Sequence, residues 1–137
     1  LWINNRIFAA IFLNDILMNY GYVKVAAAVP RVKVADCKFN AREIEKEIII
    51  AEGKGVQIIA FPELCVTGYT CGDLFAQQLL LEEAEMGLIQ IVSNTRQLDI
   101  IAILGMPIAM NGVLLNAAVE IQGGVKAWVW IVILTND

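Results

Sequence analysis

Short apolar runs separated by amphipathic stretches predict an α/β protein. Val23 to Val29 is an apolar run that ends at a proline, and we expect it to form the first strand. Val56 to Phe61 is rich in β-branched residues and also ends at a proline, which cannot donate to a strand ladder. Asp99 to Met106 predicts a third strand, closed by Pro107.

A hairpin is predicted near the end of this pattern. Asn111-Gly112 is a dipeptide typical of tight turns between antiparallel strands, and Val113 to Ile121 would return as the fourth strand. Strands that alternate with helices indicate an α/β sheet, and the hairpin adds an antiparallel part.

The first helix is predicted between the first two strands. Asn40 and Glu43 have the spacing of a capping box, in which each side chain satisfies a free backbone donor. Gly53 and Gly55 provide the stop. The expected apolar face consists of Ile44, Ile48 and Ala51. The charged residues expected to remain solvated are Glu43, Lys46 and Glu47.

A second helix is predicted from Glu82 to Gln97, with acidic residues in its first turn, where the helix dipole favours them. A short helix over Leu74 to Ala76 precedes it. We interpret Asp73 as the N-cap of that short helix, in preference to a catalytic acid.

Both ends of the chain differ from the rest. Residues 1–17 are apolar but too interrupted for a membrane span, and they lack the features of a signal peptide. We interpret them as a non-native or upstream extension before a natural start at Met18. Residues 125–137 hold two of the three tryptophans and form a divergent tail, either a frameshift after Gly124 or a β-rich terminus that pairs with a partner chain.

Composition narrows the functional classes. The chain has 137 residues, of which 58% are hydrophobic, and this fraction is high for a self-contained domain. A net charge of −4 provides no basic surface, so we expect no nucleic-acid partner. The sequence contains no histidine, which excludes a Ser-His-Asp triad and a histidine-ligated metal within this chain.

The three cysteines predict a reducing, cytoplasmic setting, because their number is odd and no signal peptide precedes them. Cys65 and Cys71 lack the C-x-x-C spacing of zinc or redox sites. We expect passive, buried thiols.

Glu63 is the candidate catalytic residue. It follows the second predicted strand directly, on a loop at the carboxyl end, where reacting groups gather in α/β proteins. Its apolar neighbours predict poor solvation, which favours a carboxylate that works as a general base. The alternative is a surface carboxylate in a turn.

The segment Phe61-Pro62-Glu63-Leu64, followed by Thr67-Gly68-Tyr69, resembles the first catalytic motif of the carbon–nitrogen hydrolase (nitrilase) superfamily. Residues 70–78 and 22–30 are similar to the glutaminase domain of bacterial glutamine-dependent NAD synthetases. The resemblance runs from about Met18 to Gly124. It implies a four-layer α-β-β-α sandwich, of which 18–124 would be the N-terminal half.

The resemblance also implies a Glu–Lys–Cys catalytic set, with Glu63 as the base. The one lysine after Lys54 is Lys126, whose neighbours do not match the motif of the family's lysine. None of Cys37, Cys65 and Cys71 occupies the place of the nucleophile. We therefore expect a truncated glutaminase domain that is inactive alone.

Four other positions have expected roles. Tyr69 either lines the substrate pocket or packs across its own loop, and Gly68 permits a positive φ angle. Asn116 should give structural support as a hydrogen-bonded polar group in an apolar run. The basic pair Arg31 and Lys33 should lie on a solvated loop.

The resemblance further implies glutamine as substrate, ammonia transfer to an absent synthetase domain, and a homo-oligomer in the full protein. No cofactor is expected in this chain, because ATP and magnesium would belong to the synthetase domain. No nucleic-acid or membrane partner is expected. Two alternatives stay open: another amidase of the superfamily, acting on a small linear amide, and a non-catalytic α/β binding or oligomerisation module.

Overall fold

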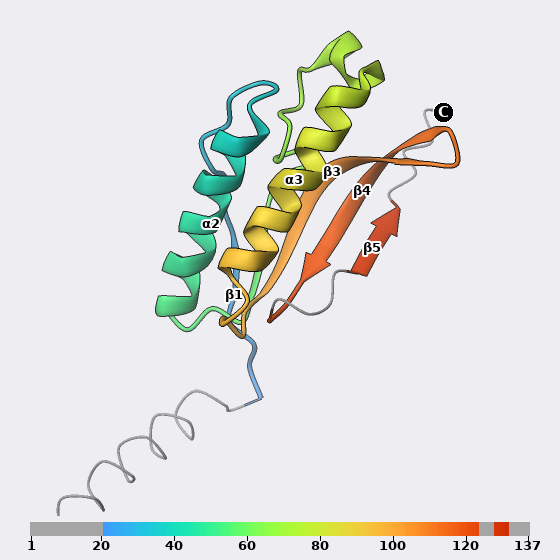
Figure 1. Ribbon diagram of the computed structural model, residues 1–137. Helices are drawn as coiled ribbons and strands as arrows, with labels where there is room; N and C mark the ends of the chain where they lie inside the picture. The colour runs from blue at the N-terminus through green and yellow to red at the C-terminus, as the bar shows by residue number, and fades with distance from the viewer. Residues whose placement is uncertain (1–20, 124–127, 132–137) are drawn as a thin grey trace, which may run out of the picture.

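One mixed sheet with α-helices on one of its faces forms the described part of the chain (Figure 1). The computed structural model describes residues 21–123 and 128–131. The sheet has five strands in the order β1-β2-β3-β4-β5. The strands are β1 (Val25–Ala27), β2 (Ile58–Ala60), β3 (Ile101–Met110), β4 (Val113–Ile121) and β5 (Trp128–Ile131). The helices are α2 (Cys37–Gly53), the 3₁₀ helix η1 (Gly72–Ala76) and α3 (Gln78–Asn94). The α/β prediction is confirmed.

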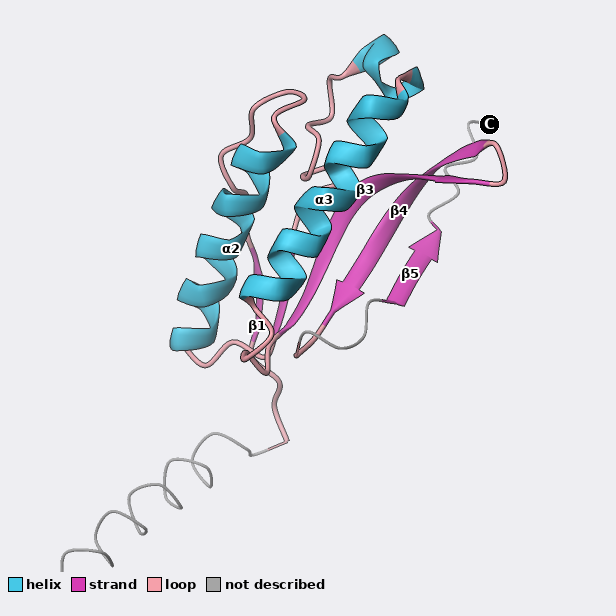
Figure 2. Cartoon of the chain, in the orientation of Figure 1, coloured by secondary structure: helices cyan, strands magenta, loops and turns pink. Residues whose placement is uncertain are grey.

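The sheet is parallel at one side and antiparallel at the other. β1, β2 and β3 run parallel, and α2 and α3 lie in the two connections between them (Figure 2). β4 pairs antiparallel with β3, and β5 pairs antiparallel with β4. The carboxyl ends of β1 and β2 therefore lie at the same edge.

The core lies between the sheet and the two α-helices. Ala102, Leu104 and Met106 of β3 face this core, and they pair across the strands with Ile121, Val119 and Ala117 of β4, which are also buried. The predicted apolar face of α2 is confirmed, because Ile44, Ile48 and Ala51 are all buried. Ile91 contributes the same kind of contact from α3.

The start of the first helix differs from the prediction. α2 begins at Cys37, and its N-cap is Asp36, whose carboxylate accepts a hydrogen bond from the Phe39 amide at 3.0 Å. Ala35, with a φ angle of +59°, turns the chain into the helix. Asn40 is inside the first turns and fully buried. The capping-box prediction was wrong because Asp36 supplies the cap earlier in the chain. The predicted stop is confirmed by the helix end at Gly53.

The parallel strands are shorter than predicted. The Lys24 amide donates to the side chain of Gln57 at 3.1 Å, and the Gln57 amide donates back to the Lys24 carbonyl at 2.8 Å. The strand ladder begins after this pair, at Val25 and Ile58, two residues later on each strand than predicted.

β3 continues through Pro107, where we predicted its end. The carbonyl groups of Ile103 and Gly105 accept bonds from Phe61 and Val66, on the side of β3 away from β4. Because strand orientation repeats every two residues, the missing N–H of Pro107 points to this same side. β2 has already ended there, so the proline removes no ladder bond.

The predicted turn of the hairpin and the fourth strand after it are confirmed residue for residue. Asn111 and Gly112 have φ angles of +52° and +77°, as a two-residue type I′ turn requires. They join Met110 to Val113, which pair across the turn.

The region before α3 required two corrections. α3 starts at Gln78, four residues before the predicted Glu82, so the acidic residues do not lie in its first turn. Asp73 lies within η1, whose N-cap is Cys71, so Asp73 is not a cap.

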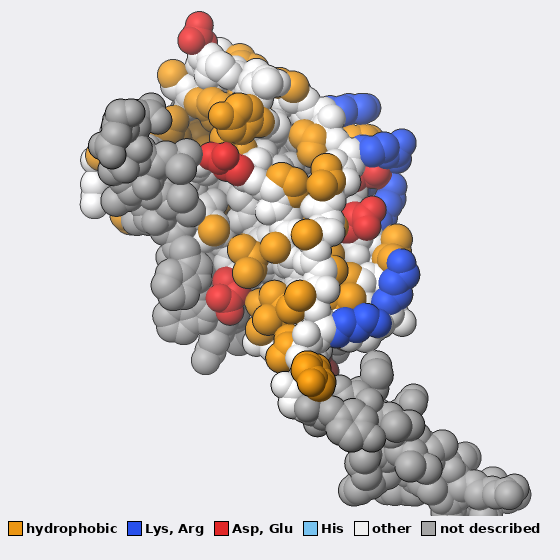
Figure 3. Space-filling view, turned by 180° about the vertical axis from the view of Figure 1, so that it is seen from behind, with side chains coloured by type: hydrophobic (Ala, Val, Ile, Leu, Met, Phe, Trp, Pro, Cys, Tyr) orange, Lys and Arg blue, Asp and Glu red, His pale blue; other side chains and the backbone are white. Residues whose placement is uncertain are grey.

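The second face of the sheet carries no helix in the described part of the chain. Seen from that side, apolar side chains spread across the surface (Figure 3). Val25 and Leu114, at 66% and 47% exposure, lie on this face by the alternation of their strands. Residues 1–17 lie outside the described residues, as does most of the predicted tail 125–137, of which β5 is described.

Candidate active site

Glu63 lies where the sequence predicted, on the loop that follows the carboxyl end of β2. The loop is held to β3 by backbone bonds on both sides of Glu63: Phe61 donates to the Ile103 carbonyl at 2.9 Å, and Val66 donates to the Gly105 carbonyl at 3.3 Å. The prediction that Glu63 is poorly solvated was wrong, because the residue is exposed. Its carboxylate points to the helix-free side of the sheet, where no other layer of the described chain covers it.

Gly105 seats the loop on β3. A Cβ atom at this position would lie 2.5 Å from the Leu64 nitrogen, 2.7 Å from the Glu63 Cα and 2.7 Å from the Pro62 oxygen. Any other residue would therefore displace the backbone that carries Glu63. Leu64 itself has a φ angle of +51°, a strained value for a branched side chain. A tight backbone approach thus fixes the position of the carboxylate.

The remainder of the loop is held by polar groups of a second loop and of α2. Asn40, fully buried, accepts from the Lys33 amide at 2.7 Å and donates to the carbonyls of Lys33 and Val66 at 2.8 and 3.0 Å. The Ala35 amide donates to the Thr67 carbonyl at 2.8 Å. The side chain of Asn40 thereby joins the two loops to the helix.

Gly68 has a φ angle of +91°, as predicted. A Cβ atom there would also lie 3.2 Å from the Cα of Val34. The glycine therefore serves both the turn and the close approach of the two loops.

Asn116 gives more than internal support to its strand. Its Nδ2 donates a hydrogen bond to Oε1 of Glu63. In the strand register Asn116 lies opposite Pro107, on the same face of the sheet as Ala118. Two segments that are far apart in the sequence therefore meet at one carboxylate.

A small open cavity of about 260 Å³ adjoins this pair. Its lining consists of Phe61, Glu63, Ile103, Leu104, Gly105, Asn116, Ala117 and Ala118. The carboxylate of Glu63 and the amide of Asn116 are the polar side chains among these lining residues, and the others are apolar or small. A small cavity with apolar walls and a few polar side chains is typical of a site that binds a small molecule.

Tyr69 does not pack across its loop. It is 68% exposed and is not part of the lining of the Glu63 cavity. Its role in substrate binding stays a prediction.

The basic loop residues Arg31 and Lys33 are exposed, as predicted, and their side chains also contact residues of α2. Arg31 Nε donates to Oε2 of Glu43 at 2.9 Å, and Lys46 forms a second ion pair with the same carboxylate. Glu43 is buried between them, with its side chain 10% exposed. The hydrogen bond from Lys46, followed by that from Arg31, holds the pKa of Glu43 below its ordinary value of 4.5. Lys33 lies over the ring of Phe39, at 4.2 Å from its centroid.

The cysteines are buried and free, as predicted. Burial raises the pKa values of Cys37 and Cys65 to about 11, so both thiols are protonated at neutral pH. The Cys65 thiol lies 3.5 Å from the Gly105 carbonyl, and the Cys71 thiol lies 3.2 Å from the Thr67 carbonyl. Buried, protonated thiols such as Cys37 and Cys65 are poor nucleophiles.

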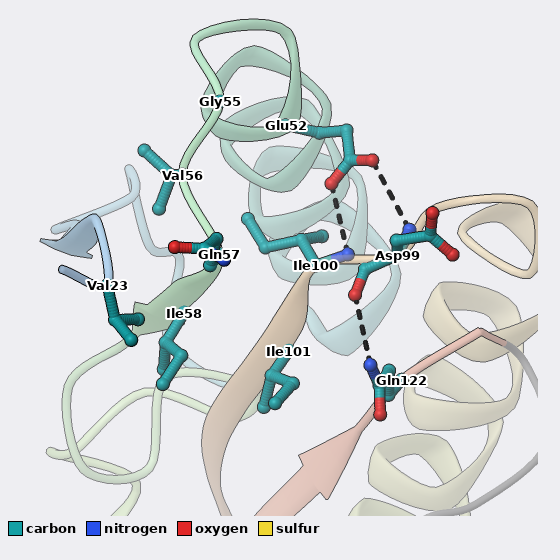
Figure 4. A pocket seen from close by; sticks show the side chains of 10 residues that line it. All are labelled: Val23, Glu52, Gly55, Val56, Gln57, Ile58, Asp99, Ile100, Ile101 and Gln122. Atoms are coloured by element: carbon teal, nitrogen blue, oxygen red, sulfur yellow. Dashed lines mark hydrogen bonds between the residues drawn. The ribbon is translucent and has the colours of Figure 1, made fainter. Parts of the chain in front are cut away.

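A second cavity, of about 620 Å³, lies at the opposite end of the strands (Figure 4). The Glu52 carboxylate in its wall accepts bonds from the amides of Asp99 and Ile100 at 3.2 and 3.0 Å, and Gln122 donates to the Asp99 carbonyl at 3.1 Å. These polar groups fix the chain at the start of β3. Within the described residues, no group of three or more acidic, cysteine or histidine side chains could hold a metal ion.

Our sequence analysis did not assign Gly105 or Asn40 to the site, although each of them carries a signal in the sequence. Gly105 stands inside an apolar strand pattern, and such a glycine is a known signal of close backbone approach. Asn40 lies four residues before Ile44 and so on the buried face of the helix, which indicates a satisfied polar group in the core.

Comparison with known proteins assigns the family. The model of the carbon-nitrogen hydrolase family matches residues 24–131. The chain belongs to this family. The matched range contains Glu63, its loop and both strands of the hairpin. It also includes β5, inside the stretch that we predicted to be a divergent tail.

Individual relatives within the family are glutamine-dependent NAD(+) synthetases. The protein of Mycobacterium leprae is 32% identical over 105 residues, which are 77% of this chain and 15% of the relative. That of Aquifex aeolicus is 39% identical over 74 residues, or 54% of the chain and 13% of the relative. The chain thus spans about a seventh of the length of the curated relatives that it matches.

Solved structures agree with the fold of this carbon-nitrogen hydrolase. A glutamine-dependent NAD(+) synthetase from Cytophaga hutchinsonii superposes with a TM-score of 0.70 at 29% identity, over 75% of this chain and 17% of that one. An amidase from Nesterenkonia sp. has a TM-score of 0.62 at 19% identity, over 77% of this chain and 40% of that one. The predicted partial nitrilase-like fold is confirmed. In the part of the chain that the structure describes, no helix is long and apolar enough to cross a membrane.

Proposed function

We propose that this chain forms part of a glutamine amidohydrolase domain that supplies ammonia to an NAD synthetase, with Glu63 as the general base. The observation that carries the proposal is the placement of Glu63. It projects from the carboxyl end of a parallel strand over an apolar cavity, and an amide from the neighbouring hairpin holds it there. Similarity to the NAD synthetases supports glutamine as the substrate.

In the proposed reaction, Glu63 accepts the proton of a cysteine thiol while the sulfur attacks the carboxamide carbon of glutamine. Glu63 then returns this proton to the leaving nitrogen, and ammonia departs. Glu63 next takes a proton from water, which attacks the thioester, and returns this proton to the cysteine sulfur as the C–S bond breaks and glutamate leaves. A lysine would stabilise the oxyanion at both tetrahedral stages.

The described cysteines are buried at other places, so the nucleophile and the lysine would come from outside the described residues. We therefore propose that the chain alone is inactive. We further propose that the complete protein is a homo-oligomer that passes ammonia to a synthetase domain, which would use ATP and magnesium. Three free thiols support a reducing, cytoplasmic setting.

The test uses this chain and a chimera. In the chimera, residues 24–131 replace the matching segment of the Mycobacterium leprae synthetase. Ammonia release from glutamine should be undetectable with the chain alone and measurable with the chimera, and Glu63→Gln should abolish it. Glu120 lies on the same face of β4 as Asn116, and the control Glu120→Gln should leave the rate of ammonia release unchanged.

The alternatives predict other outcomes. A chimera that hydrolyses a short linear amide such as butyramide faster than glutamine would favour the amidase hypothesis. Glutamine hydrolysis by the 137-residue chain alone would show that the chain is catalytically complete. A folded chimera with no amidase activity on either substrate would overturn the proposal and favour a binding module.

A further inference from the structure

We infer that Asn116 is a positioning residue for the reaction, because its amide orients the carboxylate of Glu63 and leaves one oxygen to accept a proton. The inference rests on the proposed function of Glu63 as a base. It starts from the hydrogen bond from Asn116 Nδ2 to Glu63 Oε1. That bond connects β4 with the loop after β2, across the whole of β3.

The location of Asn116 shows that burial does not require this hydrogen bond. Asn116 is partly exposed, so water could satisfy its amide without Glu63. Its neighbours on the same face of β4, Leu114 and Ala118, carry apolar side chains. An amide between them contributes no apolar contact to this surface, but it supplies a hydrogen-bond donor within reach of the Glu63 carboxylate.

The two partners are anchored to the same rigid element. Gly105, on which the Glu63 loop is seated, pairs with Ala118, and Pro107 pairs with Asn116. Donor and acceptor therefore take their positions from one strand pair, whose turn is closed locally by Asn111-Gly112. A carboxylate held from both its backbone and one oxygen has few remaining rotamers.

The chemical consequence concerns the second oxygen. Oε1 is occupied by an N–H donor, so Oε2 is the atom available to take the proton of the attacking group. The donated bond therefore sets the direction of the proton transfer.

The contact is tested first by NMR in the 137-residue chain that carries Val25→Lys as background, because this substitution on the edge strand β1 counteracts self-association through the uncovered face. The side-chain amide signal of Asn116, identified by its loss in Asn116→Ala, should move with pH as the neighbouring carboxylate titrates. It should lose this pH dependence in Glu63→Gln and retain it in the control Glu120→Gln. A signal that behaves alike in the wild type and in Glu63→Gln would overturn the inference.

The catalytic effect is tested in the chimera. Asn116→Ala should lower kcat for glutamine by about tenfold to a hundredfold, the loss expected for a hydrogen bond to a charged group, with KM within about twofold. Asn116→Leu has a similar size but no donor and no charge, so it should lose as much. A packing role would instead leave Asn116→Leu near wild-type kcat, and that result, or an unchanged kcat in Asn116→Ala, would overturn the inference.

The two proposals can fail separately. A chimera with an intact Asn116 that does not hydrolyse glutamine contradicts the proposed function, and the NMR titration still decides whether Asn116 is coupled to Glu63. Wild-type hydrolysis with no effect of either Asn116 variant contradicts the positioning role alone.

Discussion

Gly105 and Leu64 determine the place of the Glu63 carboxylate through their backbones. The chain from Pro62 to Leu64 crosses Gly105 so closely that no Cβ fits, and Leu64 takes a positive φ angle to do so. The motif resemblance identified Glu63 as the candidate base, because the motif consists of residue types that can be read directly from the sequence. It could not predict the contact with Gly105, since the two residues are separated by more than forty positions in the sequence.

Replacement of Gly105 by alanine tests this close contact between Gly105 and the backbone of the Glu63 loop. The added Cβ would lie 2.5 Å from the Leu64 nitrogen, so the loop must move. We expect Gly105→Ala to lower the free energy of unfolding by about 1 to 3 kcal/mol, the usual cost of overpacking, as measured by urea denaturation. It should also remove the pH dependence of the Asn116 amide signal, because Glu63 would leave its partner.

Gly53→Ala is the matched control. A Cβ atom at Gly53 meets nothing within 4 Å, so the free energy of unfolding of Gly53→Ala should remain within about 0.5 kcal/mol of the wild-type value. Equal effects of the two substitutions would contradict a specific role for Gly105.

At the scale of secondary structure, locally determined elements were predicted best. The turn of the hairpin was predicted residue for residue, because the conformation of Asn111-Gly112 is a property of those two residues. The start of α2 was not, because Asn40 has a capping side chain but uses it in tertiary bonds to Lys33 and Val66. The end of β3 was misplaced because the effect of Pro107 depends on where β2 stops.

The link between α2 and the preceding loop gives a pH-dependent prediction. The Glu43 carboxylate lies between Lys46 and Arg31, which hold its pKa in the folded state below the ordinary value of 4.5. A carboxylate with a lowered pKa stabilises the fold above its unfolded pKa, and this stabilisation is lost as the pH falls through the folded pKa. The stability difference between the wild type and Glu43→Gln should therefore be full at pH 7 and shrink below about pH 4.5.

Urea denaturation of both proteins from pH 7 down to pH 3 measures this difference. Glu47→Gln is the control on the same helix, since Glu47 forms no ion pair within the described residues. A difference between the wild type and Glu43→Gln that stayed constant with pH would show that the ion pairs contribute nothing.

At the scale of the whole molecule, the uncovered face of the sheet accounts for the exposure of Glu63. Sequence reasoning assigned poor solvation to this residue from its apolar neighbours, but solvation depends on what lies above the loop. Within the described residues, the helices cover the opposite face alone (Figure 1). The high apolar fraction of the sequence, 58%, agrees with a sheet whose second face is left without a cover.

We expect the isolated chain to self-associate through this face at micromolar concentrations. Val25 lies on the edge strand β1 and is 66% exposed on the uncovered face, so Val25→Lys should shift the population towards monomer in sedimentation velocity. Val29→Lys introduces the same charge beyond the end of β1, where 85% of the residue is exposed, and should change association little. A wild-type chain that is monomeric throughout the concentration series would contradict the prediction.

The local closure of the β3–β4 hairpin also has a kinetic consequence. A two-residue turn lets this hairpin form in microseconds, whereas the parallel pairs β1–β2 and β2–β3 must wait for their helical crossovers to close. Gly105 and Asn116 both belong to the hairpin. We therefore predict that, during folding, Gly105 and the hydrogen-bond donor Asn116 are in place before the segment that carries Glu63 arrives, so that the carboxylate docks onto a surface that has already formed.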